Sequence, residues 1–380
     1  MQSERYNESI KQTLFFIKFM KAASGKNPDE NDKGQKENSF QAVLEKIVDG
    51  KKVFGTSFAL KTDTLFWQGS AGNFTTDQSY FIASTTKLFT TAIILKLVSL
   101  GKLNLDDTIN NYLDKSTTRG LHLFKGIDYS NKITIKHLLA HTSGLPDYFQ
   151  GKESHGYSLE KELMAGRDQF WTFEQAIERT KKMKPLFAPG TNSKANYADS
   201  NFQLLGKIIE IVTKQSYSEI CNEQIINPLG LNKTFVYQNY TDNSPIALYY
   251  KNKELNIPKA MTSFGSDGGI VSTSTDLLVF IEAFFSGKLF PKVYIDQLQV
   301  WNNIFFPMKS GIGIHLFKLP WFFNPFGTVP YYLGHSGLSG ALAFYCPKEN
   351  LYIAGTVNQV ANPEISFKTM IQLTQIVKKK

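Results

Sequence analysis

The sequence predicts a mixed α/β (α+β) fold, in which an antiparallel sheet is flanked by helices and a mostly helical region is inserted between its strands. Strand-like segments occur near both ends of the chain, and helical periodicity dominates the stretch between residues 84 and 230. The strand-like segments near the C-terminus are separated by short turns, which favour antiparallel pairing. Helices on both faces would then cover such a sheet.

The N-terminal part of this sheet comes from two β-rich runs. Apolar residues recur at helical spacing over residues 40–47, and residues 53–60 and 65–71 follow as two strands joined by a short polar turn. Residues 22–38 are polar and contain Gly and Pro, so they are read as a linker.

The middle and the C-terminal part of the chain complete the pattern. The helical segments are residues 88–100, 135–141, 202–212 and 217–226, and Thr172 with Gln175 forms a capping box ahead of another helix. The C-terminal strands are residues 311–317, 330–333, 341–345 and 351–357, followed by a last helix at 364–377.

This order predicts three parts of the chain. Residues 1–38 form an N-terminal segment and linker that we expect to be flexible. Residues 39–80 together with 245–380 form the sheet domain, and residues 81–244 form the inserted helical domain. The active site is expected at the interface of the two domains.

Composition excludes several classes of function. The net charge is +9, but no Arg-rich stripe accompanies it, so no nucleic-acid partner is predicted. Cys221 and Cys346 lack metal-ligand spacing and are expected to be buried free thiols. We see no His/Cys/Glu cluster for a metal and no Gly-rich phosphate loop, so neither a metal nor a cofactor is predicted.

The N-terminus gives an ambiguous indication of compartment. Residues 13–20 are apolar but short and broken by Lys18, which makes a poor export signal and a segment too short to span a bilayer. A short amphipathic helix is the preferred interpretation. The exposed-looking aromatic segment 321–326 is expected to pack over the sheet or the site, with contact to a membrane as the less favoured alternative.

The chemistry-bearing feature is a serine followed three residues later by a lysine. This pattern occurs three times, at Ser84, Ser99 and Ser158, so the pattern alone is weak. Only Ser84 opens a long apolar helix after a strand and a turn. Residues three apart on a helix meet, and a helix N-terminus stabilises developing negative charge. Lys87 could therefore activate Ser84 as a nucleophile.

Several further segments, in the same order along the chain, resemble the serine β-lactamase and penicillin-binding protein superfamily. The resemblance covers roughly residue 40 to the C-terminus and is strongest to the class C-like branch, with its D-Ala-D-Ala carboxypeptidases, D-aminopeptidases and esterases. The segments are 84–87 (STTK), 101–107 (GKLNLDD), 133–145 (ITIKHLLAHTSGL), 187–191 (FAPGT), 197–206 (YADSNFQLLG), 267–273 (DGGIVST), 334–337 (GHSG) and 355–359 (GTVNQ).

By this resemblance, Tyr197 belongs to the family's Tyr-x-Asn motif and relays protons beside the serine and the lysine. Tyr197 follows a Pro-Gly turn and precedes a helix, unlike the literal matches at Tyr129, Tyr237 and Tyr250. The third position of the motif is Asp199 rather than asparagine. We expect Asp199 to line the substrate pocket and to orient Lys87 through a hydrogen bond.

The third motif of the family is usually Lys-Thr-Gly on a strand that lines the site. Lys309 begins the better literal match, but His335, Ser336 and Gly337 lie in the better context, between a strand and a turn. We assign these three residues to substrate binding. Because histidine is largely neutral at pH 7, activity on carboxylate-bearing substrates should rise as the pH falls towards 6.

The resemblance also implies an oxyanion hole made by the backbone N–H groups of Ser84 and Leu338. His141 is interpreted as a buttress at the end of a helix, and Asp267 with the two glycines after it as a tight backbone passage near the site.

The sequence therefore predicts a serine hydrolase that works through an acyl-enzyme. Its substrates, small molecules or peptides, would be D-Ala-D-Ala-type peptides or related amides and esters. One alternative is a true class C-like β-lactamase, and another is a catalytically silent protein that binds peptides as a sensor. Family members that act on the cell wall are exported, whereas the weak signal points to the cytoplasm, so the compartment stays open.

Overall fold

The centre of the fold is an eight-stranded antiparallel sheet with the strand order β10-β11-β12-β13-β14-β15-β1-β2. The computed structural model describes residues 33–153 and 156–379. The strands are β1 (Gly55–Lys61), β2 (Phe66–Gly72), β10 (Asn302–Phe305), β11 (Met308–Ser310), β12 (His315–Phe317), β13 (Tyr332–Ser336), β14 (Ala341–Cys346) and β15 (Leu351–Thr356). The N-terminal strand β1 pairs with β15, which joins the two ends of the chain in one sheet.

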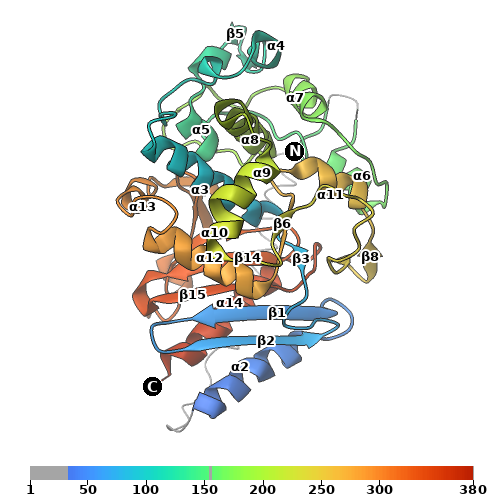
Figure 1. The fold of residues 1–380 in the computed structure, drawn as a ribbon, viewed down its shortest axis with the longest axis vertical. Helices are drawn as coiled ribbons and strands as arrows, with labels where there is room; N and C mark the ends of the chain where they lie inside the picture. The colour runs from blue at the N-terminus through green and yellow to red at the C-terminus, as the bar shows by residue number, and fades with distance from the viewer. Residues whose placement is uncertain (1–32, 154–155, 380) are drawn as a thin grey trace.

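Helices cover both faces of this sheet. On one face, α2 (Lys33–Ile47) and α14 (Glu364–Lys378) pack against each other and against the sheet through Phe40, Leu44 and Met370. On the other face, α12 (Ser274–Ser286) lies over β1, β14 and β15. Figure 1 shows α12 above β1 and β2, and α2 below them. Burial on both faces is why the strands carry apolar residues with little alternation.

A helical region stands on the α12 side of the sheet. Its central pair is α3 (Thr86–Ser99) and α8 (Asp199–Thr213), which contact each other, and Figure 1 shows both in the upper half of the molecule, below α4 and β5. The other α-helices are α4 (Lys115–Thr118), α5 (Ile135–Leu139), α6 (Leu159–Met164), α7 (Phe173–Lys181), α9 (Tyr217–Cys221), α10 (Asn227–Leu229), α11 (Pro258–Phe264) and α13 (Tyr294–Gln297). Eleven of the fourteen residues of α3 are buried, because it runs through the core.

Three small sheets complete the described part of the chain. They are β3 (Tyr80–Phe81) with β9 (Ile270–Ser272) and β6 (Phe235–Val236), β4 (Leu123–Phe124) with β5 (Ile127–Asp128), and β7 (Leu248–Tyr250) with β8 (Lys253–Leu255). The first of these matters for the site, because β3 leads directly into the turn that carries Ser84 and β9 follows Asp267.

The predicted antiparallel sheet with flanking helices is confirmed, including both N-terminal strands and the capping box of Thr172 and Gln175. Both cysteines are free and buried, as expected. Three details were wrong. The strand predicted at 311–317 is shorter, because only His315–Phe317 is a strand. The first described helix begins at Lys33, so residues 33–38 are helical rather than linker, and strands β10 and β11 were not predicted. The expected helix at 13–20 lies outside the described residues, and the division into domains stays a prediction.

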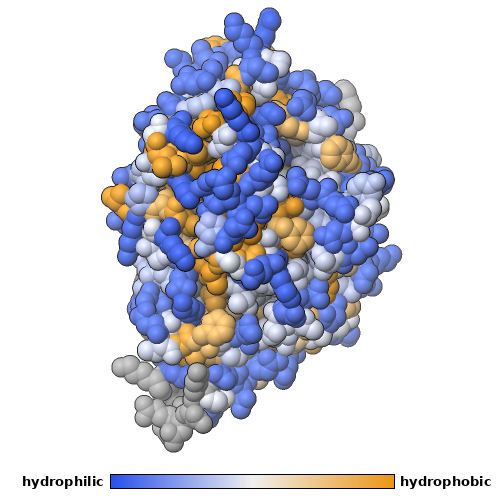
Figure 2. Space-filling view, in the orientation of Figure 1, coloured by the Kyte–Doolittle hydropathy of each residue, from blue (hydrophilic) through white to orange (hydrophobic). Residues whose placement is uncertain are grey.

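The aromatic segment 321–326 does not pack over the sheet or the site as expected. Trp321, Phe322 and Phe326 are exposed, and only Phe323 is buried. Elsewhere, apolar side chains reach the face shown in Figure 2 in separate patches among hydrophilic ones. Among the described residues, no helix combines the length and the apolar character needed to cross a membrane.

Candidate active site

Ser84 lies in a sharp turn at the start of α3. A single 3-10 turn, Ala83–Thr85, connects the short strand β3 to the helix. Ala83 has a φ of 46°, a left-handed conformation that is strained for a residue with a Cβ atom. This turn places the Ser84 side chain at the N-terminal end of α3, where it lines a pocket instead of the core.

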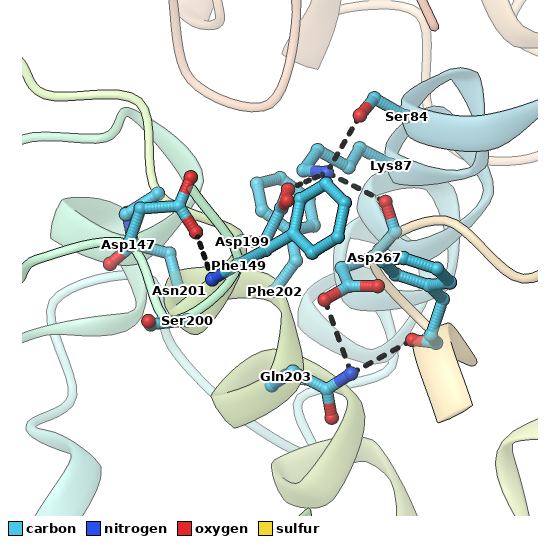
Figure 3. Close-up of polar contacts among 12 residues, drawn as sticks. Ser84, Lys87, Asp147, Phe149, Asp199, Ser200, Asn201, Phe202, Gln203 and Asp267 are labelled. Atoms are coloured by element: carbon cyan, nitrogen blue, oxygen red, sulfur yellow. Dashed lines mark hydrogen bonds and ion pairs between the residues drawn. The ribbon is translucent and has the colours of Figure 1, made fainter. Parts of the chain in front are cut away.

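Lys87, one turn into α3, is fully buried and points back at the serine. Its Nζ lies 3.3 Å from Ser84 Oγ, 2.6 Å from Asp199 Oδ1 and 2.6 Å from the backbone oxygen of Asp267. Figure 3 shows these three contacts converging on one nitrogen. Three acceptors match the three N–H donors of an ammonium group, so the geometry is that of a protonated lysine.

The charges around Lys87 support the same protonation state. Burial on its own lowers the pKa of Lys87, but the Asp199 carboxylate, followed by Tyr197 and Asp267, raises it, and the net pKa lies above the ordinary value. An uncompensated buried ammonium would be costly, and Asp199 supplies the opposite charge. Lys87 and Asp199 are thus an ion pair in the resting site.

Tyr197 lies beside this pair, as the sequence predicted. The centroid of its ring is 5.0 Å from Lys87 Nζ, and its hydroxyl is buried without a hydrogen-bond partner among the described residues. Burial raises the pKa of Tyr197, the Lys87 ammonium opposes this, and the net pKa is raised. The phenol is therefore protonated at rest and has a free donor to offer.

His141 holds the tyrosine from behind. Its ring stacks on that of Tyr197 with centroids 4.6 Å apart, and its Nδ1 accepts hydrogen bonds from the backbone of Ala198 and the side chain of Asn201. His141 itself has a φ of 56°, where the chain turns after α5. This position agrees with the prediction that His141 has a supporting role at the end of a helix, since it follows α5 and packs against Tyr197.

Asp199 begins α8, and two further buried carboxyl groups lie near it. Asp267 accepts hydrogen bonds from Tyr148 and Gln203, and Asp147 accepts one from the backbone of Phe149. Burial, followed by the Asp199 charge, raises the pKa of both Asp267 and Asp147 well above the ordinary value. These surroundings therefore disfavour the charged form of both carboxyl groups, and Asp199 is the carboxylate that makes the ion pair with Lys87.

The sequence did not predict the contact that Asp267 makes with Lys87. The two glycines after Asp267 predicted a close approach of backbone segments. The structure has one, because a Cβ atom at Gly269 would lie 2.5 Å from the Gly265 nitrogen. In the site, this segment presents the Asp267 backbone oxygen to Lys87. A backbone acceptor leaves no side-chain signature, so only the neighbouring glycines could have suggested it. Asp147 had no comparable signal.

His335 lies on β13 and is buried, with its Nδ1 2.8 Å from the Ser336 backbone oxygen. Its ring stacks on that of His315 from β12, with centroids 4.0 Å apart. Burial, followed by the charges of His315 and Lys87, lowers the pKa of His335 well below its usual value. The lowered pKa favours the neutral form of His335 and does not support the expected rise in activity on carboxylate substrates towards pH 6, which stays a prediction.

Gly337 and Leu338 follow at the end of β13, opposite the nucleophile turn. A Cβ atom at Gly337 would lie 2.3 Å from the Ile82 backbone oxygen and 3.0 Å from the Ala83 Cβ, so only glycine fits this approach. Leu338 begins a turn closed by a hydrogen bond from Gly340 to Gly337, and it lines the same pocket as Ser84. Leu338 and Ser84 thus border one pocket, and the oxyanion role of the Leu338 backbone N–H stays a prediction.

The competing motif matches lie elsewhere. Ser99 ends α3 at the surface, and Ser158 caps α6 by accepting a hydrogen bond from the Lys161 backbone. Lys309 is exposed on β11, two strands away from β13. Tyr237 donates its hydroxyl to the Asp242 backbone, away from the lysine. None of these serines or tyrosines shares a contact with Lys87.

The pocket next to Ser84 is mainly apolar. It encloses about 510 Å³, including space open to solvent, and its only ionisable walls are Asp199 and Asp267. The apolar walls come from several elements and consist of Phe149, Leu163, Met164, Leu248, Leu255, Ile257, Met261, Phe264, Leu338 and Val360. A larger cavity, lined by Glu153, Tyr157 and Arg179 among others, shares no residue with the site.

Known proteins share this arrangement of elements. A putative D-alanyl-D-alanine carboxypeptidase of Escherichia coli (strain K12) is 26% identical over 327 residues, which are 76% of this chain and 71% of that protein. A D-stereospecific amidohydrolase from Streptomyces sp. superimposes with a TM-score of 0.70 at 26% identity, covering 88% of this chain and 95% of that one. A D-amino acid amidase from Ochrobactrum anthropi SV3 has a TM-score of 0.73 at 20% identity over 90% and 98% of the two chains, and shares the fold.

The family model described as Beta-lactamase matches residues 40–372, which include the nucleophile turn, Tyr197 and the β13 motif. This match spans the sheet and the helical region together. The fold, the order of the motifs and this match agree, and the chain belongs to the Beta-lactamase family, whose members include serine hydrolases.

Proposed function

We propose that this protein is a serine hydrolase in which Ser84 attacks a carbonyl group and forms an acyl-enzyme. The supporting observation is the 3.3 Å contact between Ser84 Oγ and the buried Lys87 Nζ at the edge of the apolar pocket. The substrates would be D-alanyl-type peptides or related amides and esters, with the neutral amides and esters preferred.

The first step is the removal of the serine proton, and the ammonium state of Lys87 sets its path. Lys87 Nζ first passes a proton to Asp199 across 2.6 Å, and the amine that results turns its lone pair to Ser84 Oγ and accepts the serine proton as Oγ forms a bond to the carbonyl carbon. The third N–H of Lys87 faces the Asp267 backbone oxygen, which does not take up a proton. Burial disfavours the ion pair, so its neutral form is accessible during the reaction.

Tyr197 would deliver the second proton. Its hydroxyl is protonated and unpartnered, so it can donate to the leaving nitrogen or oxygen as the tetrahedral intermediate collapses. Tyr197 would regain a proton from the Lys87–Asp199 pair. During deacylation, water would attack the acyl carbon, its proton would pass to the same groups, and Ser84 Oγ would recover a proton as it leaves. The backbone N–H groups of Ser84 and Leu338 would hold the negatively charged oxygen, a contribution usually worth about 2.7 to 4 kcal/mol per donor.

The pocket favours a neutral, apolar acyl group. Its lining residues include no arginine, no histidine and no lysine, and the nearby Lys87 is already paired with Asp199. His335, which replaces the lysine usual at the third motif, is neutral. A free carboxylate in the pocket would lack a cation and would lie near the negatively charged Asp199, so an uncharged ester or amide fits better.

The test is intact-mass analysis after incubation with an activated ester that carries an apolar acyl group, and separately with a penicillin. The expected result is one acyl adduct on the wild-type chain, located on Ser84 by peptide mapping and missing in Ser84→Ala. Ser99→Ala is the matched control, because it removes a serine from an identical spacing pattern and should leave the adduct unchanged. Labelling of Ser84→Ala at the wild-type rate would contradict the proposal.

The same experiment separates the alternatives. A penicillin adduct that persists for hours indicates a peptidase or an esterase, whereas rapid loss with stoichiometric excess of product indicates a true β-lactamase. A protein that binds peptides without catalysis would acquire no adduct from either reagent. The three contacts of Lys87 favour the catalytic reading, because a silent protein has no need to hold an ammonium beside a serine.

A further inference from the structure

We propose that this protein docks onto anionic lipid bilayers through a surface formed by residues 318–331 and the C-terminal end of α14. We call residues 318–331 the aromatic loop. Three of its side chains are largely exposed, Trp321 at 77%, Phe322 at 66% and Phe326 at 90%. Large aromatic side chains projecting together into solvent mark an interaction surface.

The aromatic loop is held in place from within, so these side chains are presented by an ordered scaffold. Phe323 is buried, and its ring lies 5.6 Å from that of Phe306. Asn324 bridges the loop, because its Nδ2 donates to the Val329 backbone oxygen at 2.7 Å. At the far side, Lys378 Nζ and Gln375 Nε2 both donate to the Thr328 backbone oxygen, which ties the loop to α14.

The aromatic loop is too far from the site to act as a lid over it. It joins the end of β12 to the start of β13, where Phe317 pairs with Tyr332. The site lies at the opposite end of the same two strands, where His335 precedes Ser336 and Gly337. The exposed rings therefore project from the end of the sheet remote from Ser84, and a substrate in the pocket would not reach them.

The charges around the aromatic loop select an anionic partner. Residues 318–331 contain no Asp or Glu, and neither does the chain after Glu364. Lys318 and Lys379 are exposed, and Lys378 lies against the loop. One acidic residue, Glu349, lies near the end of α14 and is preceded by the exposed Lys348. The local balance is positive, in line with the net charge of +9.

A bilayer with anionic lipids can accommodate the exposed aromatic rings and can also attract the positive charge around them. Trp and Phe side chains partition into the region between headgroups and acyl chains, and nearby lysines are attracted to anionic headgroups. A second copy of the same surface is a poor alternative, because it would bring the Lys318 and Lys378 side chains of the two copies towards each other. Three largely exposed rings within six residues suit insertion between lipids.

The test uses the full chain and sedimentation with vesicles of phosphatidylcholine alone or with phosphatidylglycerol added. Wild-type protein should bind the anionic vesicles, and binding should weaken as salt is raised. The triple variant Trp321→Ala, Phe322→Ala, Phe326→Ala should bind at least fivefold more weakly. Phe170→Ala is the matched control, because this exposed aromatic residue lies in another part of the chain and its loss should change nothing.

A second measurement reports on the loop directly. Trp321 is the most exposed of the four tryptophans, so its fluorescence should shift to the blue on binding, and Trp321→Phe should remove the shift while binding persists. Failure of wild-type protein to bind anionic vesicles, or a loss below fivefold in the triple variant, would overturn the proposal. So would a concentration-dependent dimer that the triple variant abolishes in the absence of lipid. Acylation of Ser84 is measured without vesicles and is independent of each outcome.

Discussion

The Nζ of Lys87 lies 2.6 Å from Oδ1 of Asp199, and the two side chains are 0% and 8% exposed. A buried pair of this kind is held by mutual attraction against the cost of removing both charges from water. For catalysis, this ion pair means that the proton exchanged between Lys87 and Asp199 is already inside the site. The transfer between the two residues requires no exchange with solvent.

Asp199→Asn should therefore change how the rate depends on pH. In the wild-type protein, kcat should be flat between pH 6 and 9, because Lys87 and Asp199 pass one proton between them. In the variant, burial lowers the pKa of Lys87 without its main opposing charge, and only the unprotonated amine can accept the serine proton. The rate should rise with pH, by roughly tenfold per unit below the new pKa.

The measurement is the pH–rate profile with an uncharged ester. Asp147→Asn is the matched control, because Asp147 is a buried carboxyl near Asp199 whose pKa is raised and which is not among the three hydrogen-bond partners of Lys87 Nζ. Its profile should match that of the wild-type protein. Identical profiles for Asp199→Asn and wild type would remove the electrostatic role proposed for Asp199.

Gly337→Ala should inactivate the protein with little effect on folding. The new Cβ would collide with the Ile82 backbone oxygen at 2.3 Å and would push the end of β13 away from the nucleophile turn. A shift of about 1 Å at reacting groups can lower rates by roughly 100-fold. The rate of Ser84 acylation measures this effect, and the thermal unfolding midpoint tests the fold. Full activity in a folded variant would show that this close approach does not position the site.

A cation introduced into the pocket should change the substrate preference. Met164 lines the pocket and is half-buried, so a lysine at this position can keep its ammonium near solvent. We expect Met164→Lys to raise kcat/KM for an ester with a carboxylate on its acyl group by about tenfold relative to the neutral ester, equivalent to ~1.4 kcal/mol. Met164→Leu controls for the loss of the thioether. An unchanged ratio would mean that the acyl group binds elsewhere.

His315→Leu should make the protein less sensitive to acid. Burial, with the Lys87 charge, lowers the pKa of His315 to about 3, whereas an unfolded histidine titrates near 6.5. Below pH 6.5 the unfolded state therefore binds one more proton at His315 than the folded state does. The contribution of His315 to the free energy of unfolding is complete above that pH and is lost as the pH falls. The loss is about 1.4 kcal/mol per pH unit.

Urea unfolding at pH 7, 6 and 5 measures this difference. Neither ring nitrogen of His315 has a hydrogen-bond partner among the described residues, so leucine breaks no such contact. The free-energy difference between variant and wild type should grow in favour of the variant by about 1.4 kcal/mol from pH 6 to 5. The buried Asp147 and Asp267 are present in both proteins, whereas His315 contributes to the lowered pKa values of His335 and His141, so the difference reports these coupled histidines together. A difference that is constant with pH would show that His315 is protonated in the folded state.

The sequence predicted elements with a strong local signal and missed those that depend on tertiary contacts. The apolar run of α3, the β-rich run of β1 and the turn before Tyr197 each carry their own pattern, so they could be predicted directly. Strands β10 and β11 are short and lie at the edge of the sheet, with mixed composition, and gave no comparable signal.

The same distinction holds in the site. Ser84, Lys87 and Tyr197 could be proposed from motif order, and the structure brings them together. Whether His335 is charged could not be read from its residue type, because its pKa depends on burial and on the ring of His315 from a neighbouring strand. Residue type gives an ordinary pKa, and the surroundings decide how far the pKa departs from it.

The pairing of β1 with β15 also sets the order in which the protein can mature. Thr56 donates to the Thr356 backbone, a contact between residues 300 positions apart. During synthesis, Ser84 and Lys87 leave the ribosome long before β13 and β15, and contacts of such separation form slowly. A nascent chain would carry its nucleophile but no complete pocket around it, and hydrolytic competence would wait for the final strands to dock.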